Sequence, residues 1–200
     1  MASVKRNAKE PGAVMTFVPA TGERWQDLET LFGEKGACGG CWCMYWRLPA
    51  KEFREKKGSA NKRALRSLLQ EGDAPGILAY HGDAPVGWCA VAPREVYVKL
   101  GTAKSLRPVD DQPVWSITCL FVTKTMRKKG VSVELLKAAA RFVRDRGGQL
   151  VEGYPVQAAD GGTMPAVFAW TGTVAAFRQA GFQEVARPSP TRAIMRLKVG

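Results

Sequence analysis

Hydrophobic and polar positions along the chain predict a strand–turn–helix unit near its middle. Residues 114–122 form an apolar, β-branched run, which predicts a strand inside a sheet. Residues 123–129 are polar and basic and predict a tight turn. In 130–146 the apolar residues recur with the 3.6-residue period of a helix with one buried face, and Gly147 ends that helix. This geometry directs several backbone N–H groups toward one point, so the unit predicts a site for a phosphate or pyrophosphate.

Shorter periodic segments flank this unit. Apolar runs predict strands at 14–19, 77–80, 86–91 and 149–156, and a closing hairpin of 183–186 with 192–198. Helical periods predict helices at 21–36, 61–70 and 173–180, with Thr21 as the cap of the first. A charged surface connection is expected at 49–60, and an extended piece followed by a loop at 92–113. This order predicts an α+β fold with a single domain over 14–200, after a disordered leader at 1–13.

Composition and charge limit the classes of function. The chain has 200 residues, 46% of them hydrophobic, which suits one globular domain with a sizeable core. Its formal charge of +12 suggests nucleic-acid binding, but the basic residues are dispersed and no nucleic-acid-binding motif is found, so no specific nucleic acid is expected. Without a long apolar run or an apolar signal segment, no membrane and a cytoplasmic location are expected. Five cysteines, an odd number, predict free thiols.

The segment 38–47, CGGCWCMYWR, is the most unusual part of the sequence. Its three cysteines have a spacing that suggests a metal, but a structural zinc site needs four ligands, and no second pair of cysteines follows, so no metal is expected. The segment is either a buried aromatic loop against the sheet or the wall of a substrate pocket. We favour the pocket wall, because its aromatic and basic side chains would form an apolar slot with a cationic handle. The predicted substrate-contacting residues are Trp42, Tyr45, Trp46 and Arg47.

Other titratable residues give weaker signals. His81 is the only histidine and falls in a predicted turn, so a mechanism that uses a histidine base is not expected. Asp110 and Asp111 lie in a Pro-containing loop before the central strand. Such residues are usually solvated, although two adjacent carboxylates could also attract a cationic amine.

The turn and helix start in the middle of the chain carry a family resemblance. Arg127-Lys128-Lys129-Gly130-Val131-Ser132 resembles the acetyl-CoA signature of the GCN5-related N-acetyltransferase (GNAT) family, Gln/Arg-x-x-Gly-x-Gly/Ala, with Ser at the last position. Leu120-Phe121-Val122 resembles the fourth strand of that family, and Ala-Gly-Phe at 180–182 resembles the end of its fourth helix. The order of elements over 14–198 is similar to the whole domain. The resemblance implies an α/β/α layered fold with a mixed, mostly antiparallel twisted sheet, flanking helices, and central fourth and fifth strands that splay apart at a bulge.

The resemblance also implies where acetyl-CoA would bind. The pantetheine arm would lie in the splay, against the backbone of Cys119, Leu120, Phe121 and Val122, where N–H groups can stabilise an oxyanion. The pyrophosphate would lie on the N–H groups of six consecutive residues: Arg127, Lys128, Lys129, Gly130, Val131 and Ser132.

Two proton transfers remain to be assigned. Many family members protonate the leaving thiolate with a Tyr four residues before the Gly-Phe pair, and Phe177 stands at this position. We therefore predict Tyr154, or a water, as the proton donor and Glu152 as the general base, with Asp110 or Asp111 as the second candidate for the base. A surface carboxylate is the alternative interpretation of Glu152.

These features predict an acetyl-CoA-dependent N-acetyltransferase that acts on the primary amine of a small molecule by direct attack in a ternary complex. Acetyl-CoA is the expected co-substrate. The missing Tyr leaves open a non-catalytic acyl-CoA-binding or regulatory module, and a peptide or protein N-acetyltransferase is also compatible with the sequence. A homodimer is an open alternative for its assembly.

Overall fold

The computed structural model describes residues 14–158 and 168–200. The predicted leader at 1–13 lies outside the described residues, and so does most of the polar loop that was expected after the strand at 149–156.

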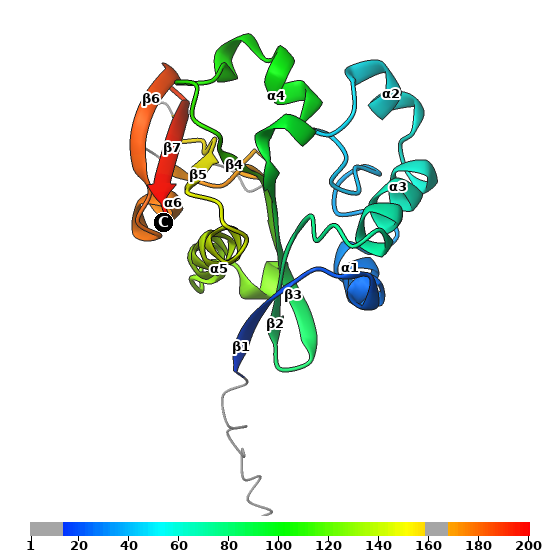
Figure 1. The fold of residues 1–200 in the computed structure, drawn as a ribbon. Coiled ribbons are helices and arrows are strands. Elements are labelled where there is room, and N and C mark those ends of the chain that lie inside the picture. The colour runs from blue at the N-terminus through cyan, green and yellow to red at the C-terminus, as the bar shows by residue number, and fades with distance from the viewer. Residues whose placement is uncertain (1–13, 159–167) are drawn as a thin grey trace, which may run out of the picture.

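A seven-stranded mixed sheet forms the centre of the fold (Figure 1). Its strand order is β1-β2-β3-β4-β5-β7-β6, and every neighbouring pair is antiparallel except β4 and β5. The strands are β1 Met15–Pro19, β2 Gly76–His81, β3 Ala84–Pro93, β4 Trp115–Val122, β5 Leu150–Gly153, β6 Gln183–Ser189 and β7 Arg192–Lys198. The predicted mixed, mostly antiparallel sheet is thus confirmed.

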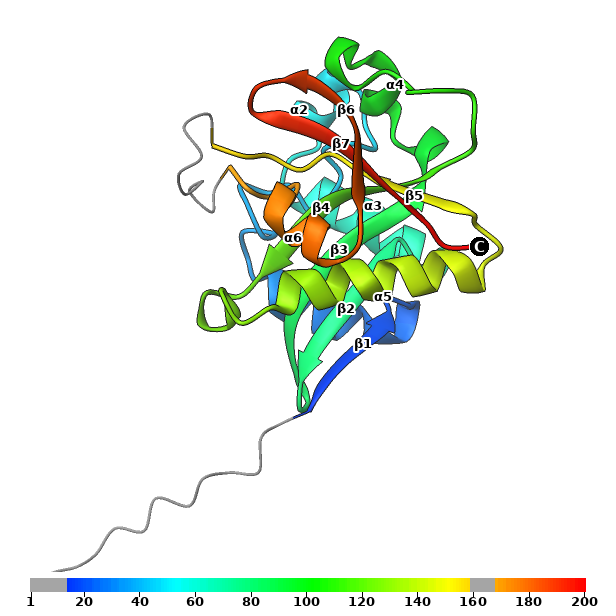
Figure 2. The same ribbon diagram turned by 90° about the vertical axis from the view of Figure 1, so that its left-hand side faces the viewer.

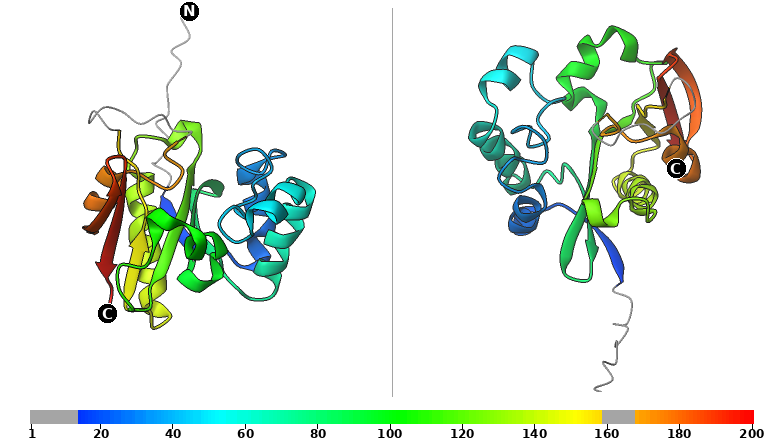
Figure 3. Two further views of the ribbon diagram at one scale, coloured as in Figure 1. Left: turned by 90° about the horizontal axis from the view of Figure 1, so that it is seen from above. Right: turned by 180° about the vertical axis from the view of Figure 1, so that it is seen from behind.

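Helices cover both faces of this sheet, which confirms the α/β/α layers (Figures 1 and 3). The α-helices are α1 Trp25–Phe32, α2 Ala50–Glu55, α3 Ser59–Gln70, α4 Val98–Thr102, α5 Val131–Asp145 and α6 Val174–Gln179. Four 3-10 helices join them: η1 Gly22–Arg24, η2 Arg94–Val96, η3 Lys104–Leu106 and η4 Lys124–Met126. Helix α5 crosses one face of β2, β3 and β4 (Figure 2), while α1, α3 and the cysteine-rich segment cover the other face.

A bulge in β4 sets which side chains face each layer. Ala90 of β3 pairs with Cys119, but the next residue, Val91, pairs with Ile117, so Thr118 is the extra residue on β4. Side chains normally alternate between the faces of a strand, and one extra residue reverses the alternation. Ile117 and Leu120 therefore both contribute to the core under α5, while Cys119 packs in the core on the opposite face.

Several predicted boundaries are wrong, each for a local reason. The helix expected at 21–36 is a 3-10 turn followed by α1, which ends at Phe32, because the chain turns at Gly33 with φ +62°. The Thr21 side chain makes no capping hydrogen bond. Two short helices, α2 and α4, replace the expected connection at 49–60 and the loop at 92–113.

Candidate active site

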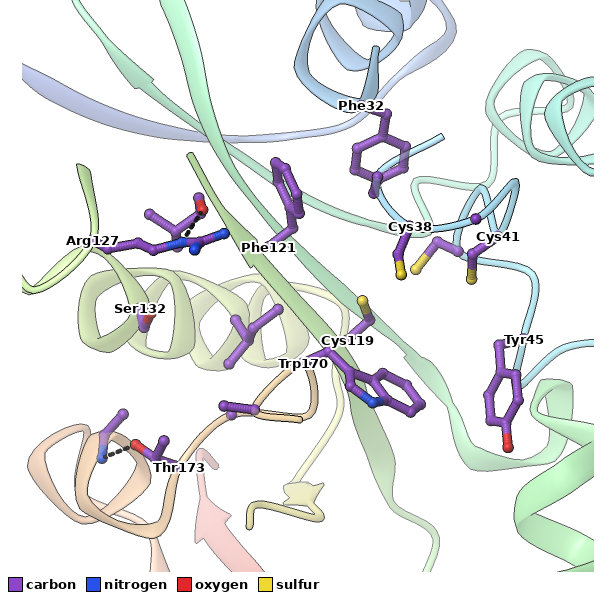
Figure 4. Close-up of a pocket in the computed structure, with 18 of the residues that line it drawn as sticks. Phe32, Cys38, Cys41, Tyr45, Cys119, Phe121, Arg127, Ser132, Trp170 and Thr173 are labelled. Atoms are coloured by element: carbon purple, nitrogen blue, oxygen red, sulfur yellow. Dashed lines mark hydrogen bonds between the residues drawn. The ribbon is translucent and has the colours of Figure 1, made fainter. Parts of the chain in front are cut away.

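The site lies where β4 loses its parallel neighbour. Strands β4 and β5 pair only from Trp115 to Ile117, and β5 ends at Gly153, so the remainder of β4 has a free edge. A cavity of about 600 Å³ follows this edge (Figure 4). Leu120 and Phe121, which point to opposite faces of the sheet, both line it, so the cavity passes through the gap between the two strands. The splay that the resemblance implied is therefore present.

One end of the cavity lies at the N-terminus of α5. Gly130 precedes the helix in the left-handed conformation, with φ +79° and no side-chain cap. The first bonds of the helix ladder are donated by the N–H groups of Val133 and Glu134 to the carbonyl of Gly130, at 2.9 and 3.2 Å, so the N–H groups of Val131 and Ser132 lie outside the ladder. Ser132 lines the cavity. These are the features that bind a phosphate at a helix start.

Among residues 123–129 of the basic turn, Arg127 alone lines the cavity. Its Nε donates a 3.1 Å hydrogen bond to the carbonyl of Val122, which holds the side chain against the free edge of β4. Lys128 and Lys129 are exposed and do not line the cavity. The predicted cofactor-binding residues Leu120, Phe121, Val122, Arg127 and Ser132 are thus brought together around one space, while Lys128, Lys129, Gly130 and Val131 lie beside it.

The other end of the cavity is formed by the cysteine-rich segment and by aromatic side chains. Figure 4 shows Cys38, Cys41 and Tyr45 on one side of Cys119, and Arg127 with Ser132 on the other side. The ring of Tyr45 meets the rings of Phe53 and Trp170 edge-on, with centroids 5.3 Å apart in both pairs. This end is therefore an aromatic slot that also carries thiols.

The four residues predicted to contact substrate divide between wall and core. Tyr45 lines the cavity. Trp42 is buried and stacks on Trp25 at 5.9 Å, so it supports the segment from behind. Trp46 lines a neighbouring hollow, and the guanidinium of Arg47 lies 5.1 Å from the centre of the Tyr97 ring. The segment is therefore both a buried aromatic loop and a wall of the cavity, because one side packs in the core and the other side faces the cavity.

A pair of thiols lies at the centre of the cavity. The indole N–H of Trp88 donates a 3.2 Å hydrogen bond to the Sγ of Cys43. The pKa of the Cys43 thiol is lowered by a hydrogen bond with Cys119, by that indole N–H and by Arg47. The pKa of Cys119 is raised well above its ordinary value by the same bond to Cys43 and by burial. Ionisation within the pair is therefore favoured at Cys43 over Cys119.

The two predicted catalytic residues lie in a buried polar network outside the cavity lining. Glu152 is fully buried, and its carboxylate accepts hydrogen bonds from Arg94 at 3.0 Å and Arg196 at 2.8 Å. Tyr154 donates to the same carboxylate at 2.7 Å and lies 2.8 Å from the hydroxyl of Ser116. Burial, and then the charge of Glu152, raise the pKa of Tyr154. The network joins β4, β5 and β7, which favours a structural role, and the catalytic assignment of both residues stays a prediction.

Phe177 occupies the position where many GNAT enzymes have their Tyr. Its ring is fully buried and packs edge-on against Phe182 at 4.9 Å. A Cβ on Gly153 would lie 2.2 Å from this ring, so the strand end and α6 are fitted closely together. Phe177 is thus a packing residue on α6.

Trp170 and Thr173 line the cavity without having been predicted as site residues. Thr173 is the N-cap of α6, and its side chain accepts a 3.3 Å hydrogen bond from the N–H of Ala176. A Thr directly before a helical period is a capping signal that can be recognised in the sequence. Trp170 follows a segment without periodicity, and nothing local in the sequence marks it. Asp110, a second candidate for the base, pairs with Arg196 at 2.7 Å, which lowers the pKa of its carboxyl, and it does not line this cavity.

Within residues 14–158 and 168–200, no three His, Cys, Asp or Glu side chains are grouped in a way that could hold a metal ion. None of the helices in these ranges is both long enough and apolar enough to cross a membrane.

Comparison with known proteins places the fold among acetyltransferases. The profile of a family described as "Acetyltransferase (GNAT) family" matches residues 42–159. No curated protein matches the sequence. A polyamine N-acetyltransferase of Drosophila melanogaster, which catalyses the formation of N-acetylagmatine, has a similar structure with a TM-score of 0.57 at 14% identity, covering 92% of this chain and 100% of that one.

Two further structures share the fold. An apo form of an agmatine N-acetyltransferase variant has a TM-score of 0.56 at 15% identity, covering 92% of this chain and 99% of that one. An acetyltransferase of Salmonella typhimurium, solved with its cofactor acetyl-CoA, has a TM-score of 0.54 at 12% identity, covering 93% and 94%. The family match thus spans more than half of the chain, and the structures extend the shared fold over nearly all of it.

Proposed function

The chain belongs to the GNAT family of acetyltransferases, and we propose that it transfers the acetyl group of acetyl-CoA to the primary amine of a small molecule, by direct attack in a ternary complex. The observation that carries this proposal is the cavity along the free edge of β4. It joins the N-terminus of α5, at Arg127 and Ser132, to the aromatic slot at Tyr45 and Trp170. A donor entering from the first end and an acceptor entering from the second would meet beside Cys119.

The residues at the α5 end fit acetyl-CoA. The N–H groups of Val131 and Ser132 are outside the helix ladder, and a phosphate can accept hydrogen bonds from both of them. No atom lies within 4 Å of where a Cβ on Gly130 would be, so the approach to these groups is open. Arg127 supplies a guanidinium at the same place. The pantetheine arm would then run along β4, past Val122 toward Cys119.

The transfer itself needs few groups from the protein. The amine nitrogen attacks the thioester carbon, the C–N bond forms, the C–S bond breaks, and the coenzyme leaves as a thiolate. One proton must leave the amine and one must reach the thiolate. Among the described residues that line the cavity, the titratable side chains are four cysteines, Tyr45, Lys57 and Arg127. Cys119 lies on β4 at the expected thioester position, but its raised pKa makes it too weak an acid to protonate a departing thiolate, so we assign to water the transfer of the amine's proton to that thiolate.

The test combines binding with product formation. A ligand that binds only the folded state at about 100 times its dissociation constant adds roughly 2.7 kcal/mol to stability, which gives a clear rise in melting temperature with acetyl-CoA. Acetylated products of an amine panel should then be detected by mass spectrometry, because the five cysteines of the chain would interfere with thiol-reactive detection of free CoA. Stabilisation by acetyl-CoA without acetylation of any small amine or peptide would favour the acyl-CoA-binding alternative. Acetylation of peptides alone would favour the peptide or protein enzyme.

A further inference from the structure

Three cations that have no carboxylate partner among the described residues, Lys57, Lys99 and Arg192, line the aromatic end of the cavity or the hollow beside it. The ammonium of Lys99 lies 3.5 Å from the centre of the Tyr45 ring and 4.7 Å from that of Phe53. Burial lowers the pKa of Lys99. Lys57 lines the cavity, and Arg192 bonds only the carbonyl of Tyr154 and the hydroxyl of Thr171. Within the described ranges none of these three cations forms an ion pair with a carboxylate.

A second hollow of about 480 Å³ adjoins the cavity, with Tyr45 common to both. Lys99 and Arg192 line this hollow together with Trp46. As far as the described residues go, no Asp or Glu lines either space. From the described residues, a ligand that extends past Tyr45 would therefore meet positive charge and no negative charge.

Trp46, which lines the same hollow, has an indole donor without a partner among the described residues. Its side chain is 9% exposed, and its indole Nε1 is buried without a hydrogen-bond partner. A buried donor without a partner is destabilising by about 1–3 kcal/mol, so such groups usually serve a ligand or a water. An indole N–H can only donate, and the group that it would bind must be an acceptor.

These observations limit the charge of the acceptor. A polyamine would bring at least two ammonium groups into a slot that already holds Lys99 and Arg192, and like charges in a partly buried site repel strongly. A carboxylate in the hollow would instead be attracted by Lys99 and Arg192, while an apolar body packed against Tyr45 and Trp170.

We propose that the acceptor is an anionic amine, a small molecule that combines a primary amine with a carboxylate and an apolar or aromatic body. This inference rests on the proposed function for the reaction of the amine, but it makes a separate claim about binding. It separates this chain from the Drosophila polyamine enzyme, which shares its fold.

The experiment uses pairs of amines that differ only in a carboxylate: arginine with agmatine, tyrosine with tyramine, and tryptophan with tryptamine. Binding of each compound to the full-length protein, saturated with CoA, is measured by calorimetry, and acetylation is followed separately by mass spectrometry. In at least one pair the carboxylate member should bind about 10- to 100-fold more tightly, the range expected for a charge-assisted hydrogen bond. Lys99→Met should remove most of that preference and leave the affinity for the decarboxylated partner unchanged or higher.

Lys198→Met is the matched control, because it removes the same charge from β7 at a residue that lines neither the cavity nor the hollow beside it. It should leave the preference intact. Equal binding within every pair, tighter binding of the decarboxylated members, or no binding at all would overturn the inference. Preferential binding of carboxylate members without acetylation would support the inference and count against the proposed reaction, so the two can fail separately.

Discussion

The backbone N–H of Leu120 donates a 2.7 Å hydrogen bond to the carbonyl oxygen of Trp170. This bond crosses the gap that opens where β5 leaves β4, and it ties the free edge of β4 to the turn before α6. The same edge is the expected path of the pantetheine arm, which carries amide groups of its own. Acetyl-CoA must therefore either replace the Trp170 carbonyl as the partner of Leu120 or bind beside it.

Hydrogen exchange should report this competition. We expect CoA to slow amide exchange in peptides that cover 119–123, because the arm would protect the free edge of β4, and to change exchange at 168–173. Peptides from β2, which is paired with a strand on both sides, serve as the internal control and should not change. Unchanged exchange at both 119–123 and 168–173 with saturating CoA would contradict the placement of the arm.

The two glycines at the ends of α5 allow a controlled test of the pyrophosphate site. Gly130 has φ +79° and Gly147 has φ +78°, and no atom lies within 4 Å of where either Cβ would be. Gly130→Glu and Gly147→Glu should therefore introduce a similar backbone strain, and each should lower the free energy of unfolding by about 1–2 kcal/mol. Only Gly130→Glu places a carboxylate at the proposed phosphate site, so it alone should weaken acetyl-CoA binding, by about tenfold or more.

The comparison is made by calorimetric titration of both variants with acetyl-CoA, alongside their thermal unfolding. Equal affinities in the two variants would place the pyrophosphate elsewhere on the protein.

Much of the sheet follows from local periodicity, and so do α3 and α5. The runs that became β2, β3 and β4 and the stripe of α5 specify their structure over consecutive residues, so a window of the sequence contains the signal. Helices α2 and α4 could not be predicted from such a window. Each is short, and each has a single buried side chain, Phe53 in α2 and Leu100 in α4, whose burial depends on distant elements.

The site also has one part that local sequence predicts and another part that it does not. The α5 end could be predicted because its residues are consecutive and match a family signature. The acceptor end could not, because Tyr45 and Trp170 are brought together from opposite parts of the chain. Glu152 was predicted as a base from its strand position, but its partners Arg94 and Arg196 lie 58 and 44 residues away in sequence, and no local pattern announces an ion pair of that kind.

Glu152→Gln tests whether this network is structural. The substitution leaves Arg94 and Arg196 without their buried carboxylate, which should lower the free energy of unfolding by about 3–5 kcal/mol. The matched control is Glu134→Gln, which breaks an exposed pair with Lys137 on α5 and should cost less than about 0.5 kcal/mol. Both are measured by denaturant unfolding.

The same variant separates a structural role from a catalytic one. If Glu152 were the general base, kcat in the folded variant should fall by about 100-fold or more. We expect kcat within about tenfold of the parent under conditions where the variant is folded. A large loss of kcat with little loss of stability would establish the catalytic prediction and overturn the structural interpretation.

The cysteines of the cavity should differ in reactivity because the thiolate is the reactive form. A lowered pKa gives Cys43 more thiolate at neutral pH, and its alkylation should be fast and should become independent of pH at a lower pH than for an ordinary thiol. Burial raises the pKa of Cys41 to about 11, so its rate should be slow at pH 7 and should still be rising at pH 9. Cys89, which is fully buried with a raised pKa, should remain unmodified in the folded protein. Peptide mass spectrometry after timed treatment with iodoacetamide gives each rate.

Trp88→Phe tests whether the indole N–H of Trp88 contributes to the lowered pKa of Cys43. Phenylalanine keeps an aromatic ring in the core but removes the N–H that donates to Cys43 at 3.2 Å, so the thiolate loses one of its stabilising partners. Alkylation of Cys43 at pH 7 should slow, whereas the rate at the exposed Cys38 should not change. Acetyl-CoA, which has no free thiol to consume the reagent, should protect Cys43 and Cys119 in the parent protein, because the acetyl group would lie between them and solvent. If Cys43 reacts no faster than Cys41, the inferred lowering of the pKa of Cys43 is wrong. If acetyl-CoA protects neither thiol of the pair, the proposed position of the thioester beside Cys119 is wrong.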